Sequence, residues 1–226
     1  AFQPGLDYVA QCFSIIKKFG MKCYAAFDAF AAGNRKRPHE QMPGLKEDGF
    51  ACEVYGLNAT GEPVICKSTQ AADLHTVGSI DDFGEIFLNP GNEKVRVYVL
   101  DLLREFVEVY HPDGIVLDRV RYVGLSTDFS DLSRKQWEAY SGVTGEHWPE
   151  DIYTIDASEN GYKENPGPYF GSFVTWRMQI IHDFIHQVHQ MLKQYPDTEF
   201  CDYTGSWYPL YYQVGANWAG PDYQGN

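Results

Sequence analysis

Two aspartates stand where a short apolar run gives way to polar, aromatic sequence. Asp118 follows Ile115-Val116-Leu117, and Asp202 follows Glu199-Phe200-Cys201. If these runs are neighbouring parallel strands of a barrel, both carboxylates lie at the end where barrel active sites are built. Hydrolysis of a glycosidic bond needs two such groups, one to protonate the leaving oxygen and one to attack or to activate water. The distance between them would decide between retention and inversion.

Each aspartate also has a purely structural interpretation. Asp118 could pair with Arg119 or Arg121, or cap a loop. Asp202 precedes Tyr-Thr-Gly, and an aspartate before such a turn often binds backbone amides. Asp28 ends a third apolar run and is the weaker candidate of the three.

Helices and strands alternate in the segments that would position these residues. Apolar spacing predicts helices near 6–19, 90–110 (with Asn89 as N-cap and Pro90 at the first position) and 170–195, and strands at 22–27, 115–117 and 199–201. A shorter helix is expected at 132–140, after Ser130-Asp131. The segments 51–57 and 62–67 flank Asn58-Ala59-Thr60-Gly61 and predict a β-hairpin, whereas 31–46 and 68–82 are expected to be loops.

This alternation is typical of βαβ units and a parallel sheet. We therefore expect an α/β fold of the TIM-type (β/α)8 class, forming one catalytic-type domain over residues 1–226 with a hairpin insertion at about 48–68. Only three strands of the parallel type are clear, so the barrel is expected to be incomplete or truncated in this chain.

The composition narrows the classes of partner. A net charge of −13 argues against nucleic acid, because the short basic run at 34–37 does not form a phosphate-binding surface. No run is long and apolar enough to span a bilayer, and the five cysteines include no CxxC pair. We expect no cofactor and no metal site. His182, His186 and His189 share a helix face, which is more typical of a solvated helix edge than of ligands.

Aromatic residues make up 15% of the chain and gather after the predicted strand ends. They could stack on sugar rings or simply pack loops. The residues expected to bind substrate are Asp28, Asn89, Arg121, Tyr122, Tyr203, Trp207, Tyr208 and Trp218.

The run Leu88-Asn89-Pro90, a helix, and then Tyr110 through Asp113-Gly114-Ile115-Val116-Leu117-Asp118 to Tyr122 resembles the signature of the glycosyl-hydrolase-like ten family. That family belongs among barrels related to the α-amylase superfamily. The resemblance implies a fourth strand ending in the nucleophile Asp118, and a general acid at Asp202, where the relatives carry Glu. Arg119 stands where the family often has a second Asp and would favour an ionised Asp118. The resemblance also implies a secreted, periplasmic or cell-surface protein.

Three functions remain as hypotheses from the sequence. The first is a glycoside hydrolase acting on α-glucan or another poly- or oligosaccharide, with Asp118 and Asp202 as the catalytic pair. The second is a carbohydrate-binding barrel without catalysis. The third is a metal-dependent hydrolase that uses the histidines.

Overall fold

A three-stranded parallel sheet forms the centre of the protein. The computed structural model describes residues 5–37, 39, 41–71, 73–77, 84–159, 161–205 and 208–217. The sheet contains β1 (Tyr24–Asp28), β6 (Gly114–Asp118) and β9 (Glu199–Asp202), in the order β1-β6-β9. The sequence predicted these three strands, and their parallel pairing is confirmed.

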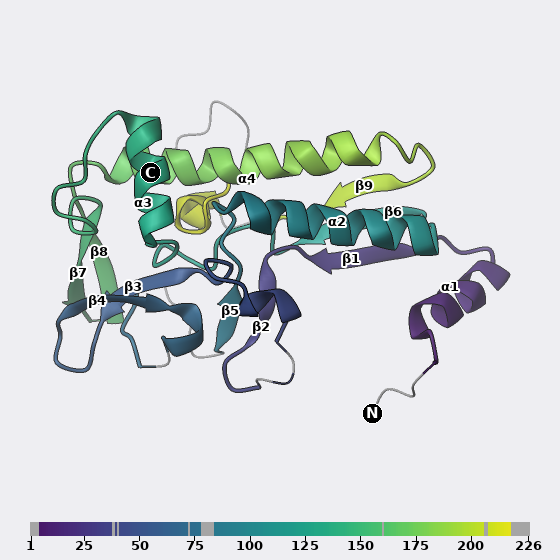
Figure 1. The fold of residues 1–226 in the computed structure, drawn as a ribbon, viewed down its shortest axis with the longest axis horizontal. Helices are drawn as coiled ribbons and strands as arrows, with labels where there is room; N and C mark the ends of the chain where they lie inside the picture. Colours follow the sequence, from purple (N-terminus) through teal and green to yellow (C-terminus); the bar gives the residue numbers. More distant parts are fainter. Residues whose placement is uncertain are drawn as a thin grey trace.

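Two long helices cover one face of this sheet. α2 (Glu93–Tyr110) and α4 (Phe170–Leu192) run beside one another along the sheet, whereas α1 (Tyr8–Lys18) lies at its N-terminal end (Figure 1). Apolar stripes on α2 and α4 face inward, which explains why both helices pack here. α3 (Asp131–Ser141) begins at the N-cap Ser130, whose hydroxyl accepts from the backbone N–H of Ser133.

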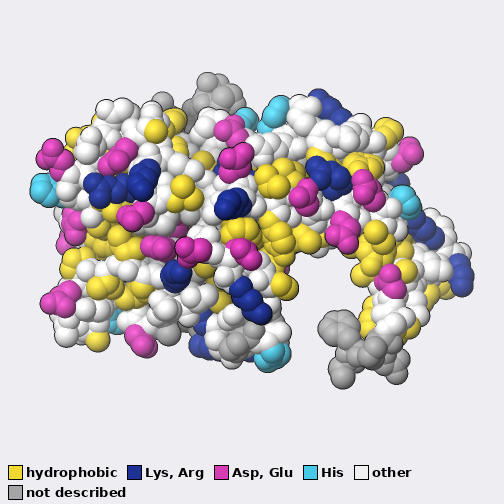
Figure 2. Space-filling model, in the orientation of Figure 1, with side chains coloured by type: hydrophobic (Ala, Val, Ile, Leu, Met, Phe, Trp, Pro, Cys, Tyr) yellow, Lys and Arg dark blue, Asp and Glu magenta, His cyan; other side chains and the backbone are white. Residues whose placement is uncertain are grey.

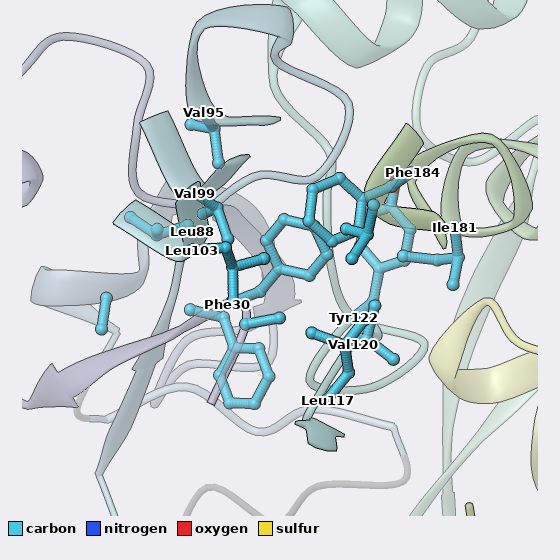
Figure 3. Packing of buried hydrophobic residues seen from close by; sticks show 14 of the residues in the cluster. Phe30, Leu88, Val95, Val99, Leu103, Leu117, Val120, Tyr122, Ile181 and Phe184 are labelled. Atoms are coloured by element: carbon cyan, nitrogen blue, oxygen red, sulfur yellow. The ribbon is translucent and has the colours of Figure 1, made fainter. Parts of the chain in front are cut away.

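The core lies between these helices and the sheet. Side chains of one face of β6 meet α2 and α4, and the loop after β6 closes the cluster, as Figure 3 shows for ten labelled residues. These residues are Phe30, Leu88, Val95, Val99, Leu103, Leu117, Val120, Tyr122, Ile181 and Phe184. Successive side chains of a strand point to opposite faces of the sheet. The face opposite α2 and α4 has no covering helix among the described residues, and Ala26 and Asp28 are exposed on it.

The remaining strands pair antiparallel in three small sheets. β2 (Ala31–Asn34) pairs with β5 (Glu85–Phe87), β3 (Glu53–Leu57) with β4 (Pro63–Lys67), and β7 (Tyr153–Ser158) with β8 (Gly161–Pro166). Among the described residues, short 3-10 helices lie at Pro43–Lys46, Ser68–Gln70 and Tyr208–Val214. A second apolar cluster, which includes Tyr55, Phe129, Trp137, Tyr153 and Phe173, packs α3 and α4 against β3 and β7.

The expectation of a TIM-type (β/α)8 barrel, complete or truncated, is wrong. The described residues hold one short parallel sheet and three separate antiparallel pairs, and no closed barrel. The physical reason lies in the connections. The segments between β1 and α2 and between α3 and α4 turn back on themselves as antiparallel pairs and do not cross over to a further parallel strand.

Several local expectations are also corrected. The segment 31–46 contains β2 and a 3-10 helix and is not a continuous loop. α2 begins after Asn92, whose side chain accepts from the Lys94 N–H, and not at Asn89. Asn89 is used differently, because its side-chain oxygen accepts from the Gly91 N–H and its amide donates to Asp128. The hairpin predicted over 51–67 is confirmed as β3 and β4.

Candidate functional site

Two carboxylates and one aromatic ring lie in a row across the carboxyl end of the parallel sheet. Asp28 and Asp118 are register partners on β1 and β6. The ladder between β6 and β9 pairs Leu117 with Asp202 and continues through a 2.8 Å hydrogen bond from the Tyr203 N–H to the Leu117 carbonyl. Tyr203 therefore follows in line with Asp118, and we refer to Asp28, Asp118 and Tyr203 as the open-face row.

The row is open to solvent at both ends. The side chain of Asp28 is 57% exposed, and Tyr203 is 70% exposed. Asp118 is half-buried between them, and its Oδ1 accepts from the Arg119 N–H at 2.7 Å. Below the row, the same face carries Ala26 and Val116, which are exposed and half-buried. The face thus offers acceptors for hydroxyl groups beside an aromatic surface.

Asp202 points to the other face of the sheet. Its register partner is Leu117, a fully buried residue of the core, so the side chains of Asp202 and Asp118 leave β9 and β6 in opposite directions. They remain near enough to interact electrostatically. Burial, with the negative charge of Asp118 as a further contribution, raises the pKa of Asp202 to about 6. Its Oδ1 is buried and has no hydrogen-bond partner among the described residues.

Arg119 joins the row to a neighbouring strand. It lies directly after Asp118 with φ of 50°, a left-handed conformation that costs a non-glycine residue about 1 kcal/mol or more. Its Nη1 is 2.6 Å from Glu85 Oε1, and its Nε is 3.7 Å from Asp28 Oδ1. The hydrogen bond with Glu85 raises the pKa of Arg119. This conformation brings a cation over the carboxylates of two different strands.

Glu85 is the member of the site that the sequence did not indicate. It lies on the three-residue strand β5, which follows a segment without clear periodicity. No local pattern marks it, because its role arises only when β5 pairs with β2 beside the end of the parallel sheet.

Three of the predicted binding residues serve the interior. Tyr122 is completely buried, and Asn89 is 1% exposed and hydrogen-bonded to Asp128 at 2.7 Å. Arg121 donates from Nη1 to the carbonyls of Tyr122 and Val123, and burial, followed by the charge of Arg119, lowers its pKa. The structure therefore brings Asp28, Asp118 and Tyr203 together at the surface. Tyr122, Asn89 and Arg121 lie beneath that surface.

The remaining predicted aromatics are two tryptophans and Tyr208. Trp207 and Trp218, together with the side chain of Tyr208, lie outside the described residues. Only the backbone of Tyr208 is placed, at the start of the 3-10 helix Tyr208–Val214.

The histidines of α4 take part in local contacts. His186 Nε2 shares a 3.1 Å hydrogen bond with Gln190, and the ring of His189 packs beside Phe200. Within the described ranges, no three His, Cys, Asp or Glu side chains gather as a metal-ligand set. None of the helices placed by the structure has the length and apolarity to cross a bilayer. Acidic and basic side chains are interspersed over the face shown in Figure 2, without a broad basic surface.

Comparison with known proteins gives a different relationship from the one the sequence motifs suggested. No family model matches the chain. The chain is 27% identical over 229 residues to an S-layer-related protein of Niallia circulans. The match covers 98% of this chain and 13% of that relative, so the chain spans about one eighth of the relative's length.

The resemblance to the glycosyl-hydrolase-like ten family and to α-amylase-type barrels is therefore wrong. No family model supports it, the similar protein carries an S-layer-related name, and the described residues form no barrel. The description of the chain as an α-amylase-like glycoside hydrolase of TIM-barrel type rested on this resemblance and is also wrong. The Asp-Gly-Ile-x-x-Asp run that suggested the resemblance has a structural role in this fold. Asp113 accepts from the Cys23 N–H, Gly114 makes room for Tyr24, and Asp118 ends the strand.

Proposed function

We propose that this chain binds saccharides on the open-face row. The observation that carries the proposal is the alignment of an exposed aromatic ring, Tyr203, with the paired carboxylates Asp28 and Asp118. An aromatic ring stacks on the apolar face of a sugar, and carboxylates accept hydrogen bonds from its hydroxyl groups. Arg119 adds a donor at the same edge. Such a mixture of flat apolar and fixed polar groups is what a sugar ring requires.

We further propose that the chain acts at the cell surface, as part of a larger protein. The support is its similarity to an S-layer-related protein, of which it matches 13%. A saccharide-binding segment within a long surface protein would hold that protein to a glycan or present a glycan to its other parts.

Cleavage of a glycosidic bond is the second candidate function. The observation that favours it is the raised pKa of Asp202, about 6, beside the negative charge of Asp118. A carboxyl group whose pKa is raised toward neutrality can act as a general acid. The strand register favours saccharide binding over cleavage as the function. The side chains of Asp118 and Asp202 leave the sheet on opposite faces, so they do not flank one position on the open face.

The binding proposal is tested by titrating the purified chain with neutral oligosaccharides of several linkages, using calorimetry. Replacing Tyr203 by Ala should weaken the binding of whichever sugar is bound by at least about tenfold, because the stacking surface is lost. Tyr140→Ala is the matched control, since Tyr140 is 50% exposed on α3 and lies outside the row. Equal affinities of the two variants, or no binding of any sugar by the wild type, would contradict the proposal.

Chromatography of the same mixtures separates binding from cleavage. Binding without cleavage leaves every oligosaccharide intact over long incubation. Release of shorter products by the wild type, and its loss in Asp202→Asn, would instead establish the second candidate. Products that persist in both Asp202→Asn and Asp118→Asn would show that neither carboxylate is responsible.

A further inference from the structure

The buried guanidinium of Arg177 has no anionic partner among the residues that the structure describes. Arg177 of α4 is fully buried, and its Nη2 donates to the carbonyls of Gly124 at 2.7 Å and Gln213 at 3.2 Å. Its Nε and Nη1 have no acceptor in the part of the chain that the structure describes. No Asp or Glu of that part lies within ion-pair distance of the guanidinium.

The carboxylate that influences Arg177 is already fully engaged. Among charged groups, Asp128 affects the pKa of Arg177, but its Oδ1 accepts from the Glu53 N–H at 2.5 Å. Its Oδ2 accepts from the side chains of Asn89, Ser130 and Ser133. Burial lowers the pKa of Arg177 to about 10, so the guanidinium remains charged at neutral pH. Buried charges are normally paired, because leaving one unpaired in a low-dielectric interior is costly.

Two buried hydroxyl groups near Arg177 also have unused donors. The Cζ of Arg177 lies 4.3 Å from the ring centre of Tyr122, a cation–π contact that partly offsets the burial of charge. The hydroxyl groups of Tyr122 and Tyr153 are buried and have no partner among the described residues. Figure 3 shows Tyr122 beside Val120, Ile181 and Phe184. The region therefore has a surplus of N–H and O–H donors, together with a positive charge.

We propose that Arg177 and the Tyr122 hydroxyl bind a small monovalent anion, of the size of chloride, inside the protein. An anion accepts hydrogen bonds from several donors at once and neutralises the buried charge. Gly215 packs closely against this region, because a Cβ at that position would lie 2.6 Å from Cδ2 of the Tyr122 ring and 3.3 Å from the Arg177 Cβ. The ion would also strengthen the junction at Arg177 between the loop after β6 and the 3-10 helix Tyr208–Val214.

Crystals of the chain grown in sodium bromide give the direct test, with diffraction collected at the bromine absorption edge. The expected result is an anomalous peak within about 3.5 Å of Arg177 Nη1 or Nε and of the Tyr122 hydroxyl. A water molecule at that position, or direct pairing of Arg177 with another part of the protein, would overturn the proposal.

Thermal unfolding gives a second, solution measurement. The melting temperature should be about 2–4 °C higher in sodium chloride than in sodium gluconate of equal ionic strength, because only chloride fits the site. Tyr122→Phe should reduce this difference, since it removes one ligand and keeps the ring. Tyr55→Phe is the control, because Tyr55 is a tyrosine of the core, 1% exposed, and is not among the groups that shift the pKa of Arg177. Equal melting temperatures of the wild type in both salts would overturn the proposal, even if bromide were seen in crystals.

Discussion

Asp202 of β9 is the register partner of Leu117 of β6, one residue before Asp118. This offset of a single residue decides which face of the sheet each carboxylate occupies, because side chains alternate along a strand. Asp118 joins Asp28 and Tyr203 on the open face, whereas Asp202 lies on the face that packs against α2 and α4. The site is therefore a row of surface groups with one partly buried carboxyl group beneath it.

Asp202 should make the stability of the protein depend on pH. Its pKa rises from 3.8 to about 6 on folding, so the folded state holds the proton more tightly than the unfolded state. The resulting stabilisation is fully present below about pH 4 and is lost as the pH rises through about 6. The free energy of unfolding of Asp202→Asn, relative to that of the wild type, should therefore increase from about pH 4 to about pH 7.5. The increase should be on the order of 1 kcal/mol, a modest value because the carboxyl group is partly exposed. Urea unfolding at both pH values measures this gain.

The control for this experiment is Asp183→Asn. Asp183 is exposed on α4 and accepts a hydrogen bond only from Gln179 among its described contacts. Its stability difference from the wild type should stay nearly constant between the two pH values. If Asp202→Asn behaved in the same way, Asp202 would not be the titrating group.

Gly114 should resist substitution, because the ring of Tyr24 lies over it. A Cβ at position 114 would overlap with Cδ1 and Cε1 of the Tyr24 ring. Tyr24 is held in place by a hydrogen bond from its hydroxyl to Glu199 on the third strand. Gly114→Ala should destabilise the protein by about 1–3 kcal/mol, measured by urea unfolding.

A double variant tests the cause of this cost. Adding Tyr24→Ala should recover much of the loss caused by Gly114→Ala, because the clash disappears. Gly171→Ala is the matched control: its Cβ position in α4 has no neighbour within 4 Å, so the change should be neutral or mildly stabilising. Additive effects of the Gly114 and Tyr24 changes would show that the ring is not the obstacle.

Asp128 should be needed as a carboxylate. It is 1% exposed and receives only donors, from the Glu53 backbone and from the side chains of Asn89, Ser130 and Ser133. Asp128→Asn would turn an amide NH2 toward one of these donors and should destabilise the protein by roughly 2–4 kcal/mol in urea unfolding. Asp131→Asn, an exposed change in the first turn of α3, should cost less than about 1 kcal/mol. Similar costs for both would contradict the role of Asp128.

The amino-acid sequence by itself determined the elements of the parallel sheet and its two covering helices. Apolar spacing marks α2 and α4, the branched run Ile115-Val116-Leu117 marks β6, and Asn58-Ala59-Thr60-Gly61 marks the hairpin turn. It therefore also placed Asp28, Asp118 and Asp202 at the carboxyl edge. These features are local, because periodicity and turn chemistry act over a few residues.

Only the tertiary structure decided how the other strands pair and which side chains reach the site. The strands β2, β5, β7 and β8 are short and carry no clear alternation, so the sequence predicted none of them, and their antiparallel pairing is known only from the structure. The register of β9, the approach of Arg119 to Glu85 and the burial of Arg177 all depend on residues far apart in the chain. Register and burial are set by packing between whole elements, and a one-residue shift that leaves local propensity unchanged moves a carboxylate to the opposite face of the sheet.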